Sequence, residues 1–106
     1  MLIQFEKRGP QDIVKLKGSL TGATAEELEN AVLGKVTGPN ADVVLNLSDL
    51  DYVSSAGIGT MVKLFKELQD RGCGMRVEDA PPRIRTLCDI AGLTQLVPFT
   101  ERKQNA

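Results

Sequence analysis

Apolar and polar residues alternate along the first part of the chain, over residues 2–7 and again over residues 12–17. Between these stretches lies Arg8-Gly9-Pro10-Gln11, which is rich in turn-forming residues. Alternation with a period of two is typical of strands that bury one face, so the pattern predicts a β-hairpin. In the second of its strands, Val14 and Leu16 are expected to face the core.

A helical pattern follows the hairpin. Thr24 and Glu27 have the spacing of a capping box, in which each side chain accepts a hydrogen bond from the backbone N–H of the other residue. The predicted helix therefore begins at Thr24 and ends in the breaker segment of residues 37–40. Its expected buried stripe consists of the apolar residues at helical spacing, which are Ala25, Leu28, Val32 and Val36.

The middle of the chain contains the pattern of a strand and a longer helix. Residues 43–47 are almost uninterrupted in apolar character, with Asn46 as the polar exception, which is typical of a central strand covered on both faces. The next helix is predicted over residues 57–70. It is expected to end at Arg71-Gly72, because glycine readily adopts the backbone conformation that closes a helix.

Shorter elements are predicted in the last third of the chain. Residues 75–78 predict a short strand, and Pro81-Pro82 suits the first turn of a third helix, where the missing N–H would have no partner. This helix would stop at Gly92, and residues 96–99 are expected to form a final edge strand. The residues of the third helix expected to face inward are Ile84, Leu87, Ile90 and Ala91.

Strands that alternate with helices require crossover connections, which produce parallel pairing. The sequence therefore predicts an α/β fold, a mixed β-sheet of about four to five strands with an initial hairpin and then β-α units, flanked by three helices. At 106 residues the chain has room for one domain. We expect this domain to occupy residues 1–100 and a polar C-terminal tail to occupy residues 101–106.

Composition and charge narrow the possible functions. Thirteen basic and 14 acidic residues leave a net charge of -1, and aromatic residues are only 4% of the chain, so features that attract or stack nucleic acid are missing. No apolar run is long enough to span a bilayer, which argues against membrane insertion and favours a cytoplasmic protein. Cys73 and Cys88 occur without any histidine, so we expect free buried thiols, no metal and no cofactor.

Two adjacent hydroxyls, those of Ser54 and Ser55, lie where the central strand gives way to the second helix. The first turn of a helix carries N–H groups without intrahelical partners and the positive end of the helix dipole, so a phosphate is favourable there. Ala56, Gly57 and Gly59 are small and leave the approach open to a partner's active site. These residues indicate a switch site on a small binding domain.

Other interpretations of the same segment are weaker or simpler. Serine is a preferred N-cap residue, and local chemistry alone favours this structural role for one of the pair. A nucleophilic serine needs a base, and no motif provides one in a chain without histidine. The spacing of Gly57 and Gly59 fits neither glycine-rich nucleotide motif. Asp49 and Asp51, in the loop predicted before the serines, are expected to be simply solvated.

The segment Leu45-Asn46-Leu47-Ser48-Asp49-Leu50-Asp51-Tyr52-Val53-Ser54-Ser55-Ala56-Gly57-Ile58-Gly59 resembles the signature of STAS domains, specifically of bacterial anti-sigma-factor antagonists. Gly18-Ser19-Leu20-Thr21 followed by Thr24-Ala25 is similar to the family's loop between its second strand and first helix. Ala91-Gly92-Leu93 resembles the end of the family's third helix. The likeness covers almost the whole chain, and it implies a STAS-like sheet flanked by helices and a protein that is not an enzyme.

The resemblance also implies a regulatory cycle. An anti-sigma factor that is a serine protein kinase phosphorylates a serine at the start of the second helix, and alignment on Gly57 makes this Ser55, with Ser54 as the second choice. The unphosphorylated domain, a monomer or weak dimer, sequesters the anti-sigma factor, and a phosphoserine phosphatase restores this form. The implied partner-binding residues are Thr21, Thr24, Ser54, Ser55, Ala56, Gly57 and Ile58.

Two positions depart from the family's pattern. Ser54 stands where the family usually has an acidic residue before the phosphorylated serine, and Thr21 stands at the acidic end of the earlier loop. These departures favour a second hypothesis, a constitutive STAS scaffold subunit of a lipid-transport or stress-signalling complex, in which no serine is switched.

Overall fold

The chain folds as one mixed β-sheet with helices packed against it, which confirms the predicted α/β class. The computed structural model describes residues 1–36 and 38–101. Strands follow one another across the sheet in chain order, with β1 antiparallel to β2 and each later strand parallel to its neighbour. The described elements are β1 Leu2–Arg8, β2 Gln11–Leu20, α1 Gly22–Lys35, β3 Asp42–Val53, α2 Ser55–Asp70, β4 Gly74–Glu78, α3 Pro82–Ile90, α4 Leu93–Leu96 and β5 Phe99–Thr100.

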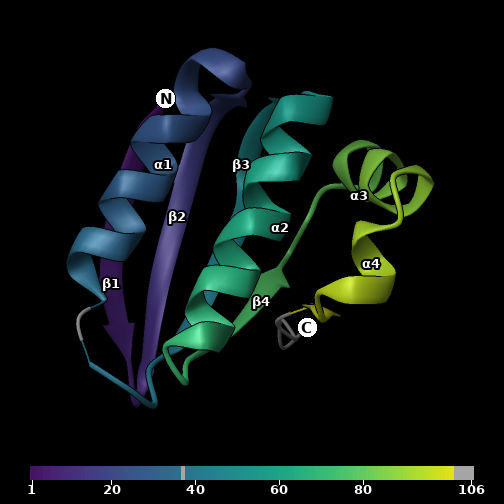
Figure 1. Cartoon of the computed structure of the whole chain (residues 1–106). Helices are drawn as coiled ribbons and strands as arrows, with labels where there is room; N and C mark the ends of the chain where they lie inside the picture. Colours follow the sequence, from purple (N-terminus) through teal and green to yellow (C-terminus); the bar gives the residue numbers. More distant parts are fainter. Residues whose placement is uncertain (37, 102–106) are drawn as a thin grey trace, which may run out of the picture.

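The core lies between the sheet and the two longest helices. Figure 1 shows α1 and α2 side by side across one face of the sheet, with α3 and α4 beyond them near β4. Alternate residues of each strand point toward this face, so the hairpin and central strand bury every second side chain beneath the helices. The stripe predicted for the first helix is buried as expected. Central members of the core are Val14, Leu16, Leu28, Val32, Leu45, Leu47, Met61, Leu64, Leu68 and Val77.

Polar side chains form a network on the opposite face of the sheet. Asn46 of β3 and Glu78 of β4 are paired across the two strands and are only 6% and 4% exposed. Asn46 Nδ2 donates to Glu78 Oε2 at 2.8 Å, and the guanidinium of Arg8 donates to the Glu78 carboxylate with a shortest distance of 2.5 Å. Because Arg8 lies on β1, this ion pair extends across β2 and β3 and connects distant strands.

The strands β2 and β3 are longer than the sequence predicted. They stay paired until Leu20 lies opposite Val53, and two irregularities in register accommodate the extra length. Asp49 and Asp51 therefore lie on a strand and not in the predicted loop, which is a correction to the sequence analysis. Both carboxylates are exposed, in agreement with the expectation that they are solvated.

Helix α3 buries a narrower stripe than predicted. Ile84 and Cys88 are buried and lie one turn apart, whereas Ile90 is 79% exposed and Ala91 is also exposed. Ile90 follows Cys88 by two positions, which places it about 200° around the helix and away from the core. The prediction of inward positions for Ile90 and Ala91 was wrong for this reason.

The chain after α3 also differs from the prediction. Gly92 adopts a φ of 81° and turns the chain into the short helix α4, which buries Leu93. Of the residues described after α4, Phe99–Thr100 pair with β4, so the predicted edge strand over residues 96–99 was placed too early and made too long.

The remaining predictions concern the two cysteines, the C-terminal tail and the absence of a membrane-spanning helix. Cys73 and Cys88 are buried free thiols, as expected. Of the predicted tail 101–106, Glu101 is exposed and the other residues lie outside the described part of the chain, as does Thr37 of the breaker segment. Within residues 1–36 and 38–101, the helices lack the length and apolar character needed to cross a membrane.

Candidate functional site

The starts of α1 and α2 meet at one edge of the sheet. The preceding strands β2 and β3 are parallel, so both helices begin at the edge where these strands end (Figure 1). The backbone N–H of Ser54 donates to the Leu20 carbonyl at 2.9 Å and joins the two strand ends. A Cβ built on Gly22 would lie 3.7 Å from the Cβ of Ala56. The structure thus brings the α1 start and the serine segment together.

Ser54 is the N-cap of α2. Its backbone is extended, with φ -92° and ψ 170°, and its Oγ accepts a hydrogen bond from Gly57 N at 3.1 Å. This bond satisfies one of the N–H groups that the first helical turn leaves without an intrahelical partner. The helix consequently begins at Ser55, two residues before the predicted start. Ser54 is half-buried, and its hydroxyl is committed to the local structure.

Ser55 is the first residue of α2 and differs from Ser54 in its exposure and its hydrogen bonding. It is exposed, and within the described chain its hydroxyl makes no hydrogen bond. The first turn of α2 carries no acidic residue, so the positive end of the helix dipole is not offset there by a carboxylate of the same turn. The surroundings of Ser55 are therefore suited to an added negative charge.

Gly57 is required by packing and does not widen the approach to the serines. A Cβ at this position would lie 2.4 Å from the Leu20 carbonyl oxygen and 3.0 Å from Leu20 Cγ. Gly57 and Ile58 are both buried, with Ile58 at 8% exposure. Gly59, in contrast, is exposed, and nothing lies within 4 Å of the Cβ it could carry. Of the glycines and alanine expected to keep the surface open, Ala56 and Gly59 do so.

The threonines Thr21 and Thr24 together form the cap of α1. Thr21 Oγ1 accepts from Ala23 N at 3.3 Å, while Thr24 Oγ1 accepts from Thr21 N at 2.9 Å and donates to the Ser19 carbonyl at 2.8 Å. The predicted cap of Thr24 with Glu27 was wrong, because the N-cap is Thr21, three residues earlier, and the helix begins at Gly22. Both threonines are half-buried, and both hydroxyls serve the cap.

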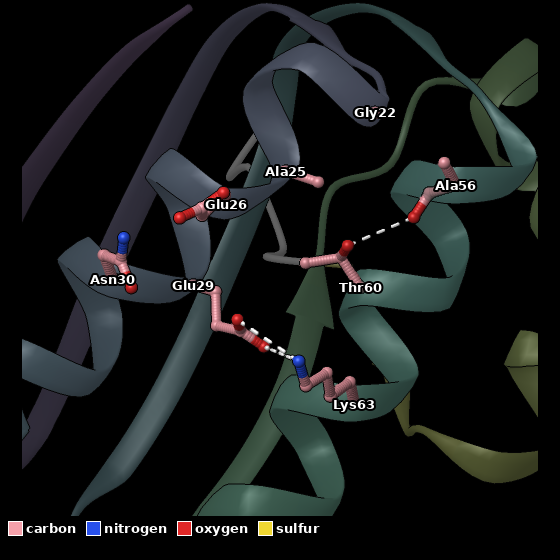
Figure 2. Close-up of a pocket in the computed structure, with 8 residues that line it drawn as sticks. All are labelled: Gly22, Ala25, Glu26, Glu29, Asn30, Ala56, Thr60 and Lys63. Atoms are coloured by element: carbon pink, nitrogen blue, oxygen red, sulfur yellow. Dashed lines mark hydrogen bonds and ion pairs between the residues drawn. The ribbon is translucent and has the colours of Figure 1, made fainter.

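A polar groove runs between α1 and α2 from this edge (Figure 2). Figure 2 shows Gly22 and Ala56 at one end, and an ion pair between α1 and α2 farther along, in which Lys63 Nζ lies 3.2 Å from Glu29 Oε2. Thr60 Oγ1 donates to the Ala56 carbonyl at 3.1 Å. The charges of Glu29 and Lys63 compensate each other. Because Glu29 lies on α1 and Lys63 on α2, their ion pair connects the two helices across the groove.

An apolar groove lies on the other side of Ser55, between the end of β3, the first turn of α2, and α3. Sequence analysis did not find it, because Ile90 was assigned to the core. Two features of the sequence could have indicated the groove. One is the Tyr52-Val53 pair directly before the serines, and the other is the position of Ile90 outside the stripe formed by Ile84 and Cys88. The groove has a volume of about 280 Å³ and is lined by Tyr52, Val53, Ser55, Ile58, Leu87, Ile90 and Ala91.

The arrangement favours a surface that is acted on by another protein. In the described part of the chain no group of three His, Cys, Asp or Glu side chains is placed to hold a metal ion. Close to Ser55 in the chain and at the adjoining start of α1, the hydroxyls of Ser54, Thr21 and Thr24 serve as helix caps, and Arg83 of α3 donates to the Asp51 carbonyl of β3 at 3.2 Å. The site thus combines an accessible alcohol, a helix N-terminus and an adjoining apolar groove.

Comparison with known proteins identifies the family. The model of the STAS domain family matches residues 3–106. The chain belongs to the STAS family. Its relatives include the anti-sigma F factor antagonist of Paenibacillus polymyxa, 27% identical over 105 residues that cover 98% of this chain and 90% of that protein. The anti-sigma-B factor antagonist of Staphylococcus epidermidis is 32% identical over 88 residues, covering 83% and 82%. This STAS domain is thus a member of the anti-sigma factor antagonists, which are regulatory proteins and not enzymes.

Solved structures show the same fold. A crystal structure from Thermotoga maritima superposes on this STAS domain with a TM-score of 0.85 at 17% identity, covering 94% of this chain and 86% of that one. The anti-sigma factor antagonist SpoIIAA in its unphosphorylated form gives a TM-score of 0.76 at 17% identity, covering 97% and 90%. SpoIIAA in the phosphorylated form gives 0.66 at 18% identity, covering 97% and 93%.

Proposed function

We propose that this STAS domain is a phosphorylation-regulated antagonist that sequesters an anti-sigma factor with serine kinase activity. The unphosphorylated domain binds the anti-sigma factor, phosphorylation of Ser55 ends binding, and a phosphoserine phosphatase restores the binding form. The single observation that carries the proposal is the contrast at the start of α2, where the Ser54 hydroxyl is used as a cap and the Ser55 hydroxyl is exposed.

The family relationship supports the proposed partner. The relatives named above are antagonists of anti-sigma factors, and their similarity extends over most of this chain and of their own length. The structural neighbour SpoIIAA is known in unphosphorylated and phosphorylated forms. These names belong to the relatives, and the corresponding partner and modification of this STAS domain are our proposal.

The chemistry of phosphorylation is consistent with this surface. A phosphate on Ser55 would add about −1.5 to −2 charges at pH 7 beside the first N–H groups of α2, which tolerate an anion. The kinase would supply the base, lysine and magnesium for phosphoryl transfer, so the substrate serine needs no catalytic neighbours. Phosphorylation would therefore leave the fold intact and change only what the surface can bind.

Thr21 and Ser54, which depart from the family's usual acidic residues, still provide helix caps around the proposed acceptor. Thr21 and Ser54 cap their helices through neutral hydroxyls, with hydrogen bonds from Ala23 N and Gly57 N. We therefore propose that the switch works at Ser55 without these carboxylates.

We expect incubation with the cognate kinase and ATP to add one phosphate to the wild type and to Ser54→Ala, and none to Ser55→Ala. Ser54→Ala keeps the exposed hydroxyl and removes only the cap, so it is a matched control. Intact mass and peptide mapping measure the result. Uptake of phosphate by Ser55→Ala would reject Ser55 as the acceptor.

The scaffold hypothesis makes the opposite prediction for binding. Ser55→Asp introduces a negative charge at the α2 start, and Ser55→Asn has similar size without the charge. For a switch, the purified anti-sigma factor should bind Ser55→Asp at least about tenfold more weakly than Ser55→Asn, in calorimetric or interferometric titration. Equal binding of both variants would favour a constitutive scaffold.

A further inference from the structure

The apolar groove beside Ser55 has an unusual amount of exposed apolar surface at its rim. Tyr52 is 51% exposed and Ile90 is 79% exposed, and they come from β3 and α3 on either side of the groove. Beneath them lie the buried Ile58 and the half-buried Leu87. Isolated exposed apolar residues are ordinary, but a concave group of them marks a binding surface.

The lining also lacks charge. The seven lining residues are apolar except for the Tyr52 and Ser55 hydroxyls, and none is acidic or basic. The polar groove on the other side of Ser55 is lined partly by Glu26, Glu29 and Lys63, so the two sides of the serine differ in character. A groove of about 280 Å³ is suited to one or two side chains and is too small for a helix or a drug-sized ligand.

We propose that this groove receives an apolar side chain of the anti-sigma kinase when that protein reaches Ser55. The inference rests on the proposed function and adds the contact that holds the partner. The argument for this occupant is continuity, because Ser55 is itself a wall of the groove. A protein whose active site approaches the Ser55 hydroxyl covers the adjoining groove, and burial of Ile90 and Tyr52 then favours the complex.

The same geometry gives a physical reason for release. A phosphate on Ser55 puts a hydrated dianion on the wall of the groove, and an apolar side chain that enters must displace part of its hydration. The phosphate therefore opposes occupation of the groove without a change in the fold. Phosphorylation of Ser55 and removal of apolar side chains from the groove therefore weaken the same contact with the partner.

The test compares substitutions inside and outside the groove. Ile90→Ser and Ala91→Glu alter exposed positions in the groove, whereas Leu2→Ser removes a side chain that is 52% exposed at the start of β1. The probe is the purified anti-sigma kinase that binds the wild type best among those of the same genome. We expect Ile90→Ser and Ala91→Glu to weaken binding at least about tenfold and Leu2→Ser less than about twofold.

Three outcomes separate the inference from the function on which it rests. Loss of binding in both groove variants, with circular dichroism unchanged and Leu2→Ser normal, supports the groove. Normal binding of both groove variants overturns the groove while the proposed function stands. A wild type that neither binds any of the kinases nor is phosphorylated by them overturns both.

A double-mutant cycle tests the link to phosphorylation. Because Ser55→Asp and Ile90→Ser act on the same contact, the fold-change caused by Ser55→Asp should be several times smaller in the Ile90→Ser background than in the wild type. Independent effects, with equal fold-changes in both backgrounds, would contradict the proposal that the charge acts through the groove.

Discussion

Gly57 sets how closely α2 approaches the sheet. The sequence suggested that its small size gives access to the serines, but its missing side chain faces inward, toward the carbonyl of Leu20. The hydrogen bond from Ser54 N to the same carbonyl fixes the strand ends beneath the helix. The absence of a side chain at Gly57 therefore determines how far Ser55 lies from the ends of the strands.

We expect Gly57→Ala to destabilise the fold by about 2 kcal/mol, because the new methyl group cannot fit 2.4 Å from a backbone oxygen without moving the helix. Gly59→Ala is the matched control in the same helix, where the methyl group meets open space. It should stabilise the fold by about 0.5–1 kcal/mol through helix propensity. Urea unfolding measures both, and equal stability of the two variants would contradict the packing role.

At the scale of the elements, helix starts and the α3–α4 corner are set by short-range hydrogen bonds. Thr21 and Ser54 determine where α1 and α2 begin, and in both cases the helix starts before the predicted residue. At the corner, Thr94 Oγ1 donates to Asp89 Oδ1 at 2.6 Å. This bond, with a smaller contribution from Arg85, holds the pKa of Asp89 below its ordinary value.

Helix α3 also buries a titratable group, which gives a prediction about alkaline pH. Burial, aided by the negative charge of Asp89 and partly opposed by Arg85, raises the pKa of the Cys88 thiol from 9.0 to about 11. As pH rises, the unfolded chain releases the thiol proton at a lower pH than the folded chain. The contribution of Cys88 to the free energy of unfolding is therefore complete below pH 9 and is lost as pH rises toward 11. The free energy of unfolding should fall by about 1 kcal/mol between pH 8 and 10 from this group.

The measurement is urea unfolding at pH 8, 9 and 10 for the wild type and Cys88→Ala. The alanine variant is less stable at every pH because it leaves a cavity, but its stability should decline less steeply over this range. Identical slopes for the two proteins would show that Cys88 does not contribute to the alkaline loss.

At the scale of the whole molecule, the network of Arg8, Asn46 and Glu78 connects the first strand to the fourth. Asn46 Oδ1 also accepts hydrogen bonds from the N–H and the hydroxyl of Ser48, at 3.0 and 2.6 Å. A buried carboxylate is costly unless charges and donors compensate it, and Arg8 and Asn46 do so here. The network thus ties the hairpin to the parallel part of the sheet.

We expect Arg8→Ala to destabilise the fold by about 1–3 kcal/mol, because it leaves the Glu78 carboxylate buried with fewer compensating groups. Lys7→Ala is the control from the neighbouring position. Its ion pair with Asp12 at 2.9 Å is on the surface, with Lys7 70% exposed, and should contribute less than about 0.5 kcal/mol. Chemical unfolding compares them, and equal losses would argue against a special role of the Glu78 network.

The sequence by itself determined the class of fold, the order of the elements as far as α3 and the place of the two serines. Alternation in the hairpin, the apolar run at residues 43–47 and the glycine at position 72 are local signals, because they reflect the faces that strands and helices must bury and the way helices end. The expectation that one serine acts as a cap also follows from local chemistry.

Only the tertiary structure decided what each of these residues contacts. That Ser54 rather than Ser55 caps the helix, that Gly57 packs on Leu20, and that Ile90 faces solvent depend on the relative positions of β2, α2 and α3. The apolar groove depends on the same positions, since its walls come from three elements far apart in the chain. Periodicity records which residues favour burial, but the surface against which each one packs is set by distant segments.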